Sequence, residues 1–144
     1  SDRLGVPDMS RRILTLAILA LIAVFAVAAC DSGEASTDDA PGAYTVAAAE
    51  AVELIESGER VVIDVRSPAE FAEAHIVGAL NIDVNGPGFS EQIAELDVDE
   101  PYLVYCRSGN RSAQAASQME DIGIKDIADA GGLAELAAAG APVE

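Results

Sequence analysis

One loop contains a cysteine and two arginines that are candidates for a reactive site. Cys106 follows a short apolar run over residues 102–105, and it precedes the polar sequence Arg-Ser-Gly-Asn-Arg-Ser and a helix-like run that ends near Ile122. A cysteine placed between a buried strand and a helix start lies where backbone N–H groups and the helix dipole favour an anion. Both features favour thiolate over thiol. We therefore predict that Cys106 is a nucleophile.

The residues that follow Cys106 are predicted to bind its substrate. Gly109 is expected to have a positive φ where the loop curls. Arg107 and Arg111 are expected to attract an anionic donor; solvent-exposed charge is the alternative role, and we favour it more for Arg107 than for Arg111. Ser112 is expected to cap the following helix, and its hydroxyl could also face the pocket. The full predicted substrate-binding set is Arg107, Ser108, Gly109, Asn110, Arg111 and Ser112.

The charge balance limits the possible partners. The chain has 144 residues and a formal net charge of −17, which argues against binding to nucleic acid because that function needs a basic face. From Cys30 onward there are five Lys and Arg residues, and two of them lie in the Cys106 loop. With one histidine and one cysteine besides Cys30, we expect no metal site. We expect no other cofactor, because a glycine-rich dinucleotide motif is absent.

The N-terminal segment has the pattern of a targeting sequence. Residues 13–29 contain no charged residue, follow Arg11 and Arg12, and end in Val-Ala-Ala before Cys30. Small residues before a cysteine resemble the lipobox of bacterial lipoproteins. The alternative is an uncleaved transmembrane helix, although seventeen residues are at the short limit for crossing a bilayer.

This pattern predicts where the protein is located. We expect residues 1–29 to be a signal peptide, in which residues 1–8 are an upstream extension before Met9. Cys30 is then expected to be lipidated, and two or more acyl chains give stable membrane attachment. The expected location is the extracytoplasmic side of the cell membrane.

The remaining chain divides into a tether and one folded domain. Residues 30–42 are polar and acidic, which predicts a flexible tether. Residues 43–144 alternate between strand-like and helix-like segments, so we predict an α/β domain whose central, mostly parallel sheet is flanked by helices. The predicted strands are 44–46, 61–65, 79–82, 102–105 and 125–128, and the predicted helices are 47–57, 67–74, 89–96, 112–122 and 133–139.

Three further polar residues are candidates for the site. Asp64 and Arg66 lie at the carboxyl end of the predicted strand 61–65, so Asp64 could lie at the pocket mouth. We favour a structural role, in which Arg66 pairs with Glu70 and fixes the turn into the next helix. Ser67 and Glu70 are expected to form a capping box at the start of that helix. His75 is the single histidine. We expect it to stabilise a turn and not to act as a base.

Four blocks of residues follow one another along the folded part. They are Asp64-Val65-Arg66 with Pro68 and Glu70-Phe71, His75-Ile76 with Gly78-Ala79 and Asn81-Ile82, the loop 105–112, and Gly131-Gly132-Leu133. With these blocks the folded part resembles a rhodanese-like domain, which is a sulfurtransferase module. Any one block is weak, but four blocks in the right order are a strong match. Two positions depart from the family pattern: Ala74 stands where glycine is common, and Leu136 stands where an aromatic residue is frequent.

The resemblance implies a function. It implies a small α/β domain that passes sulfane sulfur through a Cys106 persulfide, from a small anionic donor such as thiosulfate to cyanide or a thiol. We expect the domain to act as a monomer. Two alternatives remain. The first is a carrier or partner-docking module without turnover. The second is a cysteine phosphatase, which we disfavour because four residues, and not five, separate Cys106 from Arg111.

Overall fold

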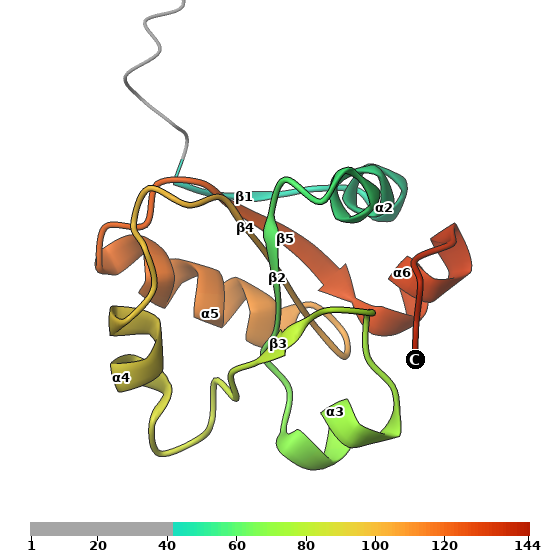
Figure 1. The fold of residues 1–144 in the computed structure, drawn as a ribbon. Helices are drawn as coiled ribbons and strands as arrows, with labels where there is room; N and C mark the ends of the chain where they lie inside the picture. Colours follow the sequence, from blue (N-terminus) through green and yellow to red (C-terminus); the bar gives the residue numbers. More distant parts are fainter. Residues whose placement is uncertain (1–41) are drawn as a thin grey trace, which may run out of the picture. The chain divides into compact units, whose positions relative to one another are not determined.

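The computed structural model describes residues 42–144, and its elements alternate between strand and helix (Figure 1). The predicted α/β architecture is confirmed. The elements are β1 (Ala43–Thr45), α2 (Ala48–Ser57), β2 (Val61–Asp64), α3 (Pro68–Glu73), β3 (Leu80–Asn81), α4 (Phe89–Ala94), β4 (Tyr102–Cys106), α5 (Asn110–Asp121), β5 (Ile127–Gly132) and α6 (Leu133–Ala139).

The five strands form one parallel sheet in the order β1-β5-β4-β2-β3. The register pairs Asp64 with Tyr105 and Cys106 with Gly132. Because the strands are parallel, their carboxyl ends meet at one edge of the sheet. This edge brings together the loops that follow β2, β4 and β5, which is where ligands bind in open α/β sheets.

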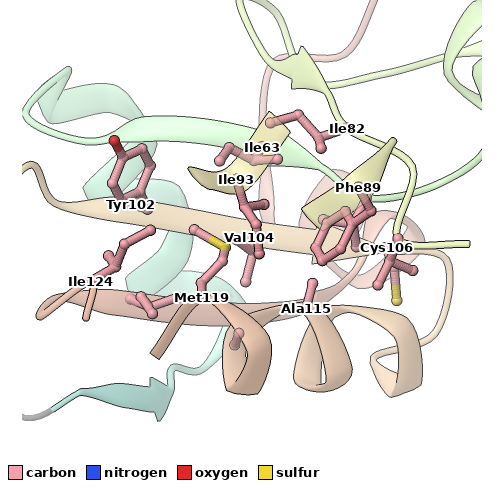
Figure 2. Packing of buried hydrophobic residues seen from close by; sticks show 14 residues of the cluster. Ile63, Ile82, Phe89, Ile93, Tyr102, Val104, Cys106, Ala115, Met119 and Ile124 are labelled. Atoms are coloured by element: carbon pink, nitrogen blue, oxygen red, sulfur yellow. The ribbon is translucent and has the colours of Figure 1, made fainter. Parts of the chain in front are cut away.

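Helices cover both faces of the sheet, so two separate cores form. Figure 1 shows α4 and α5 on one face and α2 and α6 on the other. Strand β4 is buried along its whole length and alternates between the two cores. Its residues Val104 and Cys106 pack in the cluster with Ala115 and Met119 of α5, as Figure 2 shows. Its residues Leu103 and Tyr105 pack in the cluster with Ala51 of α2 and Leu136 of α6. The Cys106 side chain therefore lies on the α5 face.

Local sequence explains why the segments begin and end where they do. The β-branched run of β2 suits a strand that is covered on both faces. Ser67 and Glu70 form the predicted capping box at the start of α3, and Pro68 occupies the first helical turn. Gly58 ends α2 with φ +68°. Among the described residues, no helix is both long and apolar enough to cross a membrane.

Two boundaries near the cysteine differ from the prediction. Helix α5 begins at Asn110 and not at Ser112, because Gly109 takes φ +96° and accepts the first helical hydrogen bond, from the N–H of Ala113. Gly109, and not Ser112, is therefore the residue before the helix, and the predicted cap at Ser112 is wrong. Strand β5 extends to Gly132, because the pairing with Cys106 continues the ladder across an irregularity in β4.

Candidate active site

Cys106 ends β4 with its sulfur enclosed by the loop that follows. The N–H of Gly109 donates a hydrogen bond to the Cys106 Sγ at 3.0 Å. The exposed fraction of Cys106 is 0 %. Cys106 is a free cysteine, without a disulfide partner in residues 42–144. The N-terminus of the twelve-residue helix α5 adds positive potential at the same place.

The surroundings of the sulfur favour the thiolate. Burial raises the pKa of the Cys106 thiol, but hydrogen bonds from the backbone N–H and the hydroxyl of Ser112 and from the N–H groups of Ser108 and Gly109 outweigh burial. The pKa therefore lies below the ordinary thiol value of 9.0. A lowered pKa and a ring of N–H donors are the properties of an activated nucleophile.

Ser112 lies next to the sulfur, inside the first turn of α5. Its side chain is buried, its Oγ is 3.7 Å from the Cys106 Sγ, and its hydroxyl donates to the Gly109 carbonyl at 2.9 Å. One hydroxyl proton serves one strong acceptor at a time. The Ser112 hydroxyl therefore stabilises the Cys106 thiolate only when it turns from the Gly109 carbonyl to the sulfur, and this rotation needs no movement of the backbone.

The backbone of β5 approaches the cysteine loop closely at Gly132. A Cβ atom on Gly132 would lie 2.7 Å from the Arg107 carbonyl oxygen and would also overlap the Glu135 carboxylate. Gly132 has φ −107°, which any residue can adopt, so it is the lack of space that requires glycine here. The end of β5 therefore fixes the position of the loop from one side.

Arg111 is held by a carboxylate from another element. Its Nη1 and Nη2 donate to Oε2 and Oε1 of Glu70, at 2.7 and 2.8 Å. This pairing lowers the pKa of Glu70 from 4.5 to about 2. Glu70 also closes the capping box of α3, so the ion pair ties α3 to the start of α5. Arg111 thus keeps its charge near Cys106 while its two terminal nitrogens are occupied.

The other predicted loop residues face the solvent. Arg107, Ser108 and Asn110 are exposed. The side chain of Arg107 makes no hydrogen bond or ion pair within residues 42–144. Arg107 therefore offers an unpaired cation directly beside Cys106, whereas sequence reasoning placed more weight on Arg111.

Asp64 and Arg66 form a buried ion pair at the end of β2. Arg66 Nη2 is 2.6 Å from Asp64 Oδ2 and also donates to the Ala74 carbonyl at 2.6 Å. The predicted pair between Arg66 and Glu70 is wrong, because the Arg66 guanidinium pairs with the carboxylate of Asp64, two residues earlier in the chain. The side chain of Asn81 donates to the main-chain carbonyls of Asp64 and Arg66, which closes the network.

His75 makes contacts of a structural kind. Its Nδ1 is 2.9 Å from the Phe71 carbonyl, so Nδ1 must carry the proton of this hydrogen bond. The His75 ring stacks on the Phe71 ring, with centroids 3.8 Å apart. Its Nε2 lies 3.4 Å from a carboxylate oxygen of Glu144. These contacts fit the turn-stabilising role that we expect for His75.

Comparison with known proteins gives this geometry a family. The sequence profile described as "Rhodanese-like domain" matches residues 47–139. The chain belongs to the rhodanese-like domain family. It is 37 % identical over 95 residues to thiosulfate sulfurtransferase GlpE of Pseudomonas putida, which covers 66 % of this chain and 84 % of GlpE. It is 33 % identical over 75 residues to thiosulfate sulfurtransferase PspE of Escherichia coli, which covers 52 % of this chain and 72 % of PspE.

Solved structures agree with this assignment. A rhodanese-related protein from Thermoplasma volcanium superposes with a TM-score of 0.61 and 31 % sequence identity. The match covers 69 % of this chain and 96 % of that structure. The fold of this chain therefore matches nearly the whole of that solved structure.

The roles of two residues at this rhodanese-like site were not predicted from the sequence. Glu70 was predicted as a helix cap but not as the partner of Arg111, because 41 residues separate them in the chain. Gly132 was noted only as part of a glycine pair, and that pair at a strand end was the available signal for a close backbone approach. Within residues 42–144, no group of three or more His, Cys, Asp and Glu side chains is placed to hold a metal ion. Cys30, the predicted lipidation site, lies outside the described residues.

Proposed function

We propose that this rhodanese-like domain is a thiosulfate sulfurtransferase that uses Cys106 as its nucleophile. The observation that carries the proposal is the Cys106 sulfur, held by the Gly109 N–H at 3.0 Å at the start of a helix. Such donors stabilise negative charge on sulfur both in the thiolate and in a persulfide. The relatives GlpE and PspE, both thiosulfate sulfurtransferases, support the same activity.

The reaction has two displacement steps. In the first, the Cys106 thiolate attacks the outer sulfur of thiosulfate, the S–S bond of the donor breaks, and sulfite leaves with the electron pair. In the second, cyanide or a thiolate attacks the outer sulfur of the Cys106 persulfide, and the Cys106 thiolate leaves. One sulfur atom is transferred to Cys106 in the first step and to the acceptor in the second, and no external oxidant or reductant is needed.

Arg107 is the proposed contact for the incoming donor. It is exposed, adjacent to Cys106 and unpaired within the described residues. Arg111 instead acts as a positioning residue, because Glu70 occupies both of its terminal nitrogens. Since Cys106 is fully buried, the donor reaches its sulfur when the exposed segment 107–108 moves aside.

The direct test measures thiocyanate formed from thiosulfate and cyanide. We expect turnover by the wild-type protein, and we expect Cys106→Ser to abolish it while the circular dichroism spectrum and the melting temperature stay close to those of the wild type. Activity of Cys106→Ser near the wild-type level would overturn the proposal.

The complete burial of Cys106 supports one second candidate, a sulfur carrier that exchanges with a docked partner. A carrier would form a stable persulfide from thiosulfate but release it to cyanide with negligible turnover. A phosphatase is less suitable, because Arg111 already donates one N–H from each terminal nitrogen to Glu70, whose carboxylate offsets its charge. Hydrolysis of an aryl phosphate by the wild type but not by Cys106→Ser would reverse this preference.

We also propose that the domain is attached to a membrane through Cys30, facing the extracytoplasmic side. The support is the sequence pattern alone: the positive pair Arg11-Arg12, the uncharged residues 13–29, and small residues before Cys30. The domain would then meet its sulfur donor and acceptor outside the cytoplasm.

A further inference from the structure

A cleft of about 450 Å³ begins at the cysteine loop and extends between α3 and α6. Its wall includes Arg107, the residue after Cys106, together with Arg66 from the end of β2. Its other side is apolar and includes Leu133, Ala137 and Val143. Thiosulfate and cyanide need only a small part of this space, whereas pockets for organic ligands span roughly 300–1,000 Å³. The cleft therefore has room for a larger reactant.

Arg66 offers one free donor to this cleft. The residue is 6 % exposed, and its guanidinium is fixed by Asp64 through Nε and Nη2 and by the Ala74 carbonyl through Nη2. The Arg66 Nη1 makes no hydrogen bond within residues 42–144. Every fully buried side-chain nitrogen in this part of the chain has a hydrogen-bond partner, so Nη1 is not fully buried. The Nη1 edge is therefore open to the solvent of the cleft. A fixed guanidinium with a free N–H edge is a preorganised site for a carboxylate.

The cations of this acidic chain are distributed unevenly. Arg60, Arg111 and Lys125 are each paired with a carboxylate, at 2.8, 2.7 and 2.5 Å. Arg66 is paired with Asp64 but keeps its Nη1 free, and Arg107 has no ion pair within residues 42–144; both line the cleft. Two carboxylates also line it. Glu70 is neutralised by Arg111, and Glu73 is exposed.

We propose that Arg66 and Arg107 form a carboxylate-binding subsite in this cleft, which selects acidic low-molecular-weight thiols as sulfur acceptors over neutral ones. The carboxylate would bind Arg66 Nη1 and the Arg107 guanidinium, and the short aliphatic part would lie on Leu133 and Ala137. This inference rests on the proposed sulfur transfer. The acceptor thiol gives its proton to solvent, its thiolate attacks the outer persulfide sulfur, and Cys106 leaves as thiolate. The product is the organic persulfide.

The test compares two acceptors of matched size, mercaptopropionate and mercaptopropionamide, with rates corrected for the thiolate fraction of each. For the wild-type protein charged with thiosulfate sulfur, we expect kcat/KM to favour the acid by about tenfold, the effect of one charge-assisted contact. Ala137→Glu places a carboxylate on the cleft wall and should remove this preference. Ala139→Glu adds the same charge to the same helix outside the cleft and should keep it.

The outcomes separate this inference from the proposed function. If cyanide accepts sulfur but the wild type transfers equally to the acid and the amide, the subsite is overturned and the sulfurtransferase stands. The same conclusion follows if Ala137→Glu keeps the preference, or if Ala139→Glu removes it to the same extent. If neither cyanide nor either thiol accepts sulfur, the proposed function itself fails. Binding of mercaptopropionate that is lost in Ala137→Glu and retained in Ala139→Glu would support the subsite independently of turnover.

Discussion

At the scale of single residues, the chemistry depends on how the Cys106 sulfur is held. The donors come from one loop and one helix start, and together they outweigh burial, which alone would keep the thiol protonated. A strand, a positive-φ glycine and a helix are enough to build this site. It therefore needs no general base: the nucleophile is already ionised to a greater extent than a free thiol at the same pH.

The lowered pKa of Cys106 gives the first prediction. The rate of alkylation by iodoacetamide, measured against pH in the folded protein, should show a midpoint below 9.0. Ser112→Ala removes the hydroxyl that lies 3.7 Å from the sulfur and should move this midpoint upward. Ser117→Ala, on the exposed side of the same helix, is the matched control and should leave it in place. A midpoint at or above 9.0 in the wild type would contradict the account of the thiolate.

The same shift predicts how stability depends on pH. Because folding lowers the pKa of Cys106, the ionised thiol stabilises the folded state fully above the unfolded value of 9.0, and this stabilisation is lost as the pH falls through the folded pKa. The difference in free energy of unfolding between the wild type and Cys106→Ser should therefore rise toward pH 9 and then level off. Urea titrations over this range measure it, and a difference that falls as the pH rises would have the wrong sign.

At the scale of elements, the ion pair between Glu70 and Arg111 connects α3 to α5. Glu70→Gln should destabilise the fold by roughly 1–2 kcal/mol, since the pair is bidentate but partly exposed. The pKa of Glu70 is lowered to about 2, so the stabilisation is fully present above pH 4.5 and is lost as the pH falls toward 2. Urea unfolding of the variant and the wild type at pH 7 and at pH 3 measures this. An equal stability difference at both pH values would contradict it.

A substitution at Gly132 tests whether β5 positions the cysteine loop. Gly132→Ala should push the Arg107 carbonyl away, because the new Cβ would lie 2.7 Å from that backbone oxygen. Displacing a nucleophile loop by a fraction of an ångström typically costs on the order of tenfold to a hundredfold in rate. Gly131→Ala is the control: it has φ +76° but meets nothing within 4 Å, so it should lower stability and spare kcat/KM. Equal rate losses in both variants would assign the effect to backbone strain.

At the same scale, local signals explain which boundaries were predictable. Gly58 and the capping box at Ser67 and Glu70 depend on neighbours within a few residues, so the sequence predicts α2 and α3 closely. The start of α5 depends on how the loop closes over the Cys106 sulfur. That closure sets Gly109 at φ +96° and moves the helix start before Ser112. This geometry is tertiary and cannot be predicted from local propensity.

At the scale of the whole molecule, pairing across the fold decides which charges are free. Sequence spacing is compatible with an ion pair between Arg66 and Glu70. In the fold, Arg66 instead pairs with Asp64, and Glu70 pairs with Arg111. The sequence could therefore predict the candidate cysteine, its loop and the α/β sheet, because each depends on a local pattern. It could not predict that Arg107 and not Arg111 is the unpaired cation beside Cys106, because that depends on an ion pair between residues 41 positions apart.

Membrane attachment through Cys30 is a prediction about the entire chain. Cys30→Ala should either release the protein from the membrane fraction or leave it unprocessed, because the thiol that receives the acyl chain is gone. Cell fractionation followed by intact mass measurement distinguishes the two forms. Cys106→Ser, which removes the other cysteine, is the control and should remain attached. An acylated, membrane-bound Cys30→Ala protein would refute lipidation at this residue.

The most direct test of the central claim is the intact mass of the protein after exposure to thiosulfate, before and after cyanide is added. We expect the wild type to gain the mass of one sulfur atom and to lose it to cyanide as thiocyanate forms, and we expect Cys106→Ser to gain nothing. A wild-type protein that never gains this mass, or a Cys106→Ser variant that gains it equally, would contradict the assignment of Cys106 as the residue that carries the sulfur.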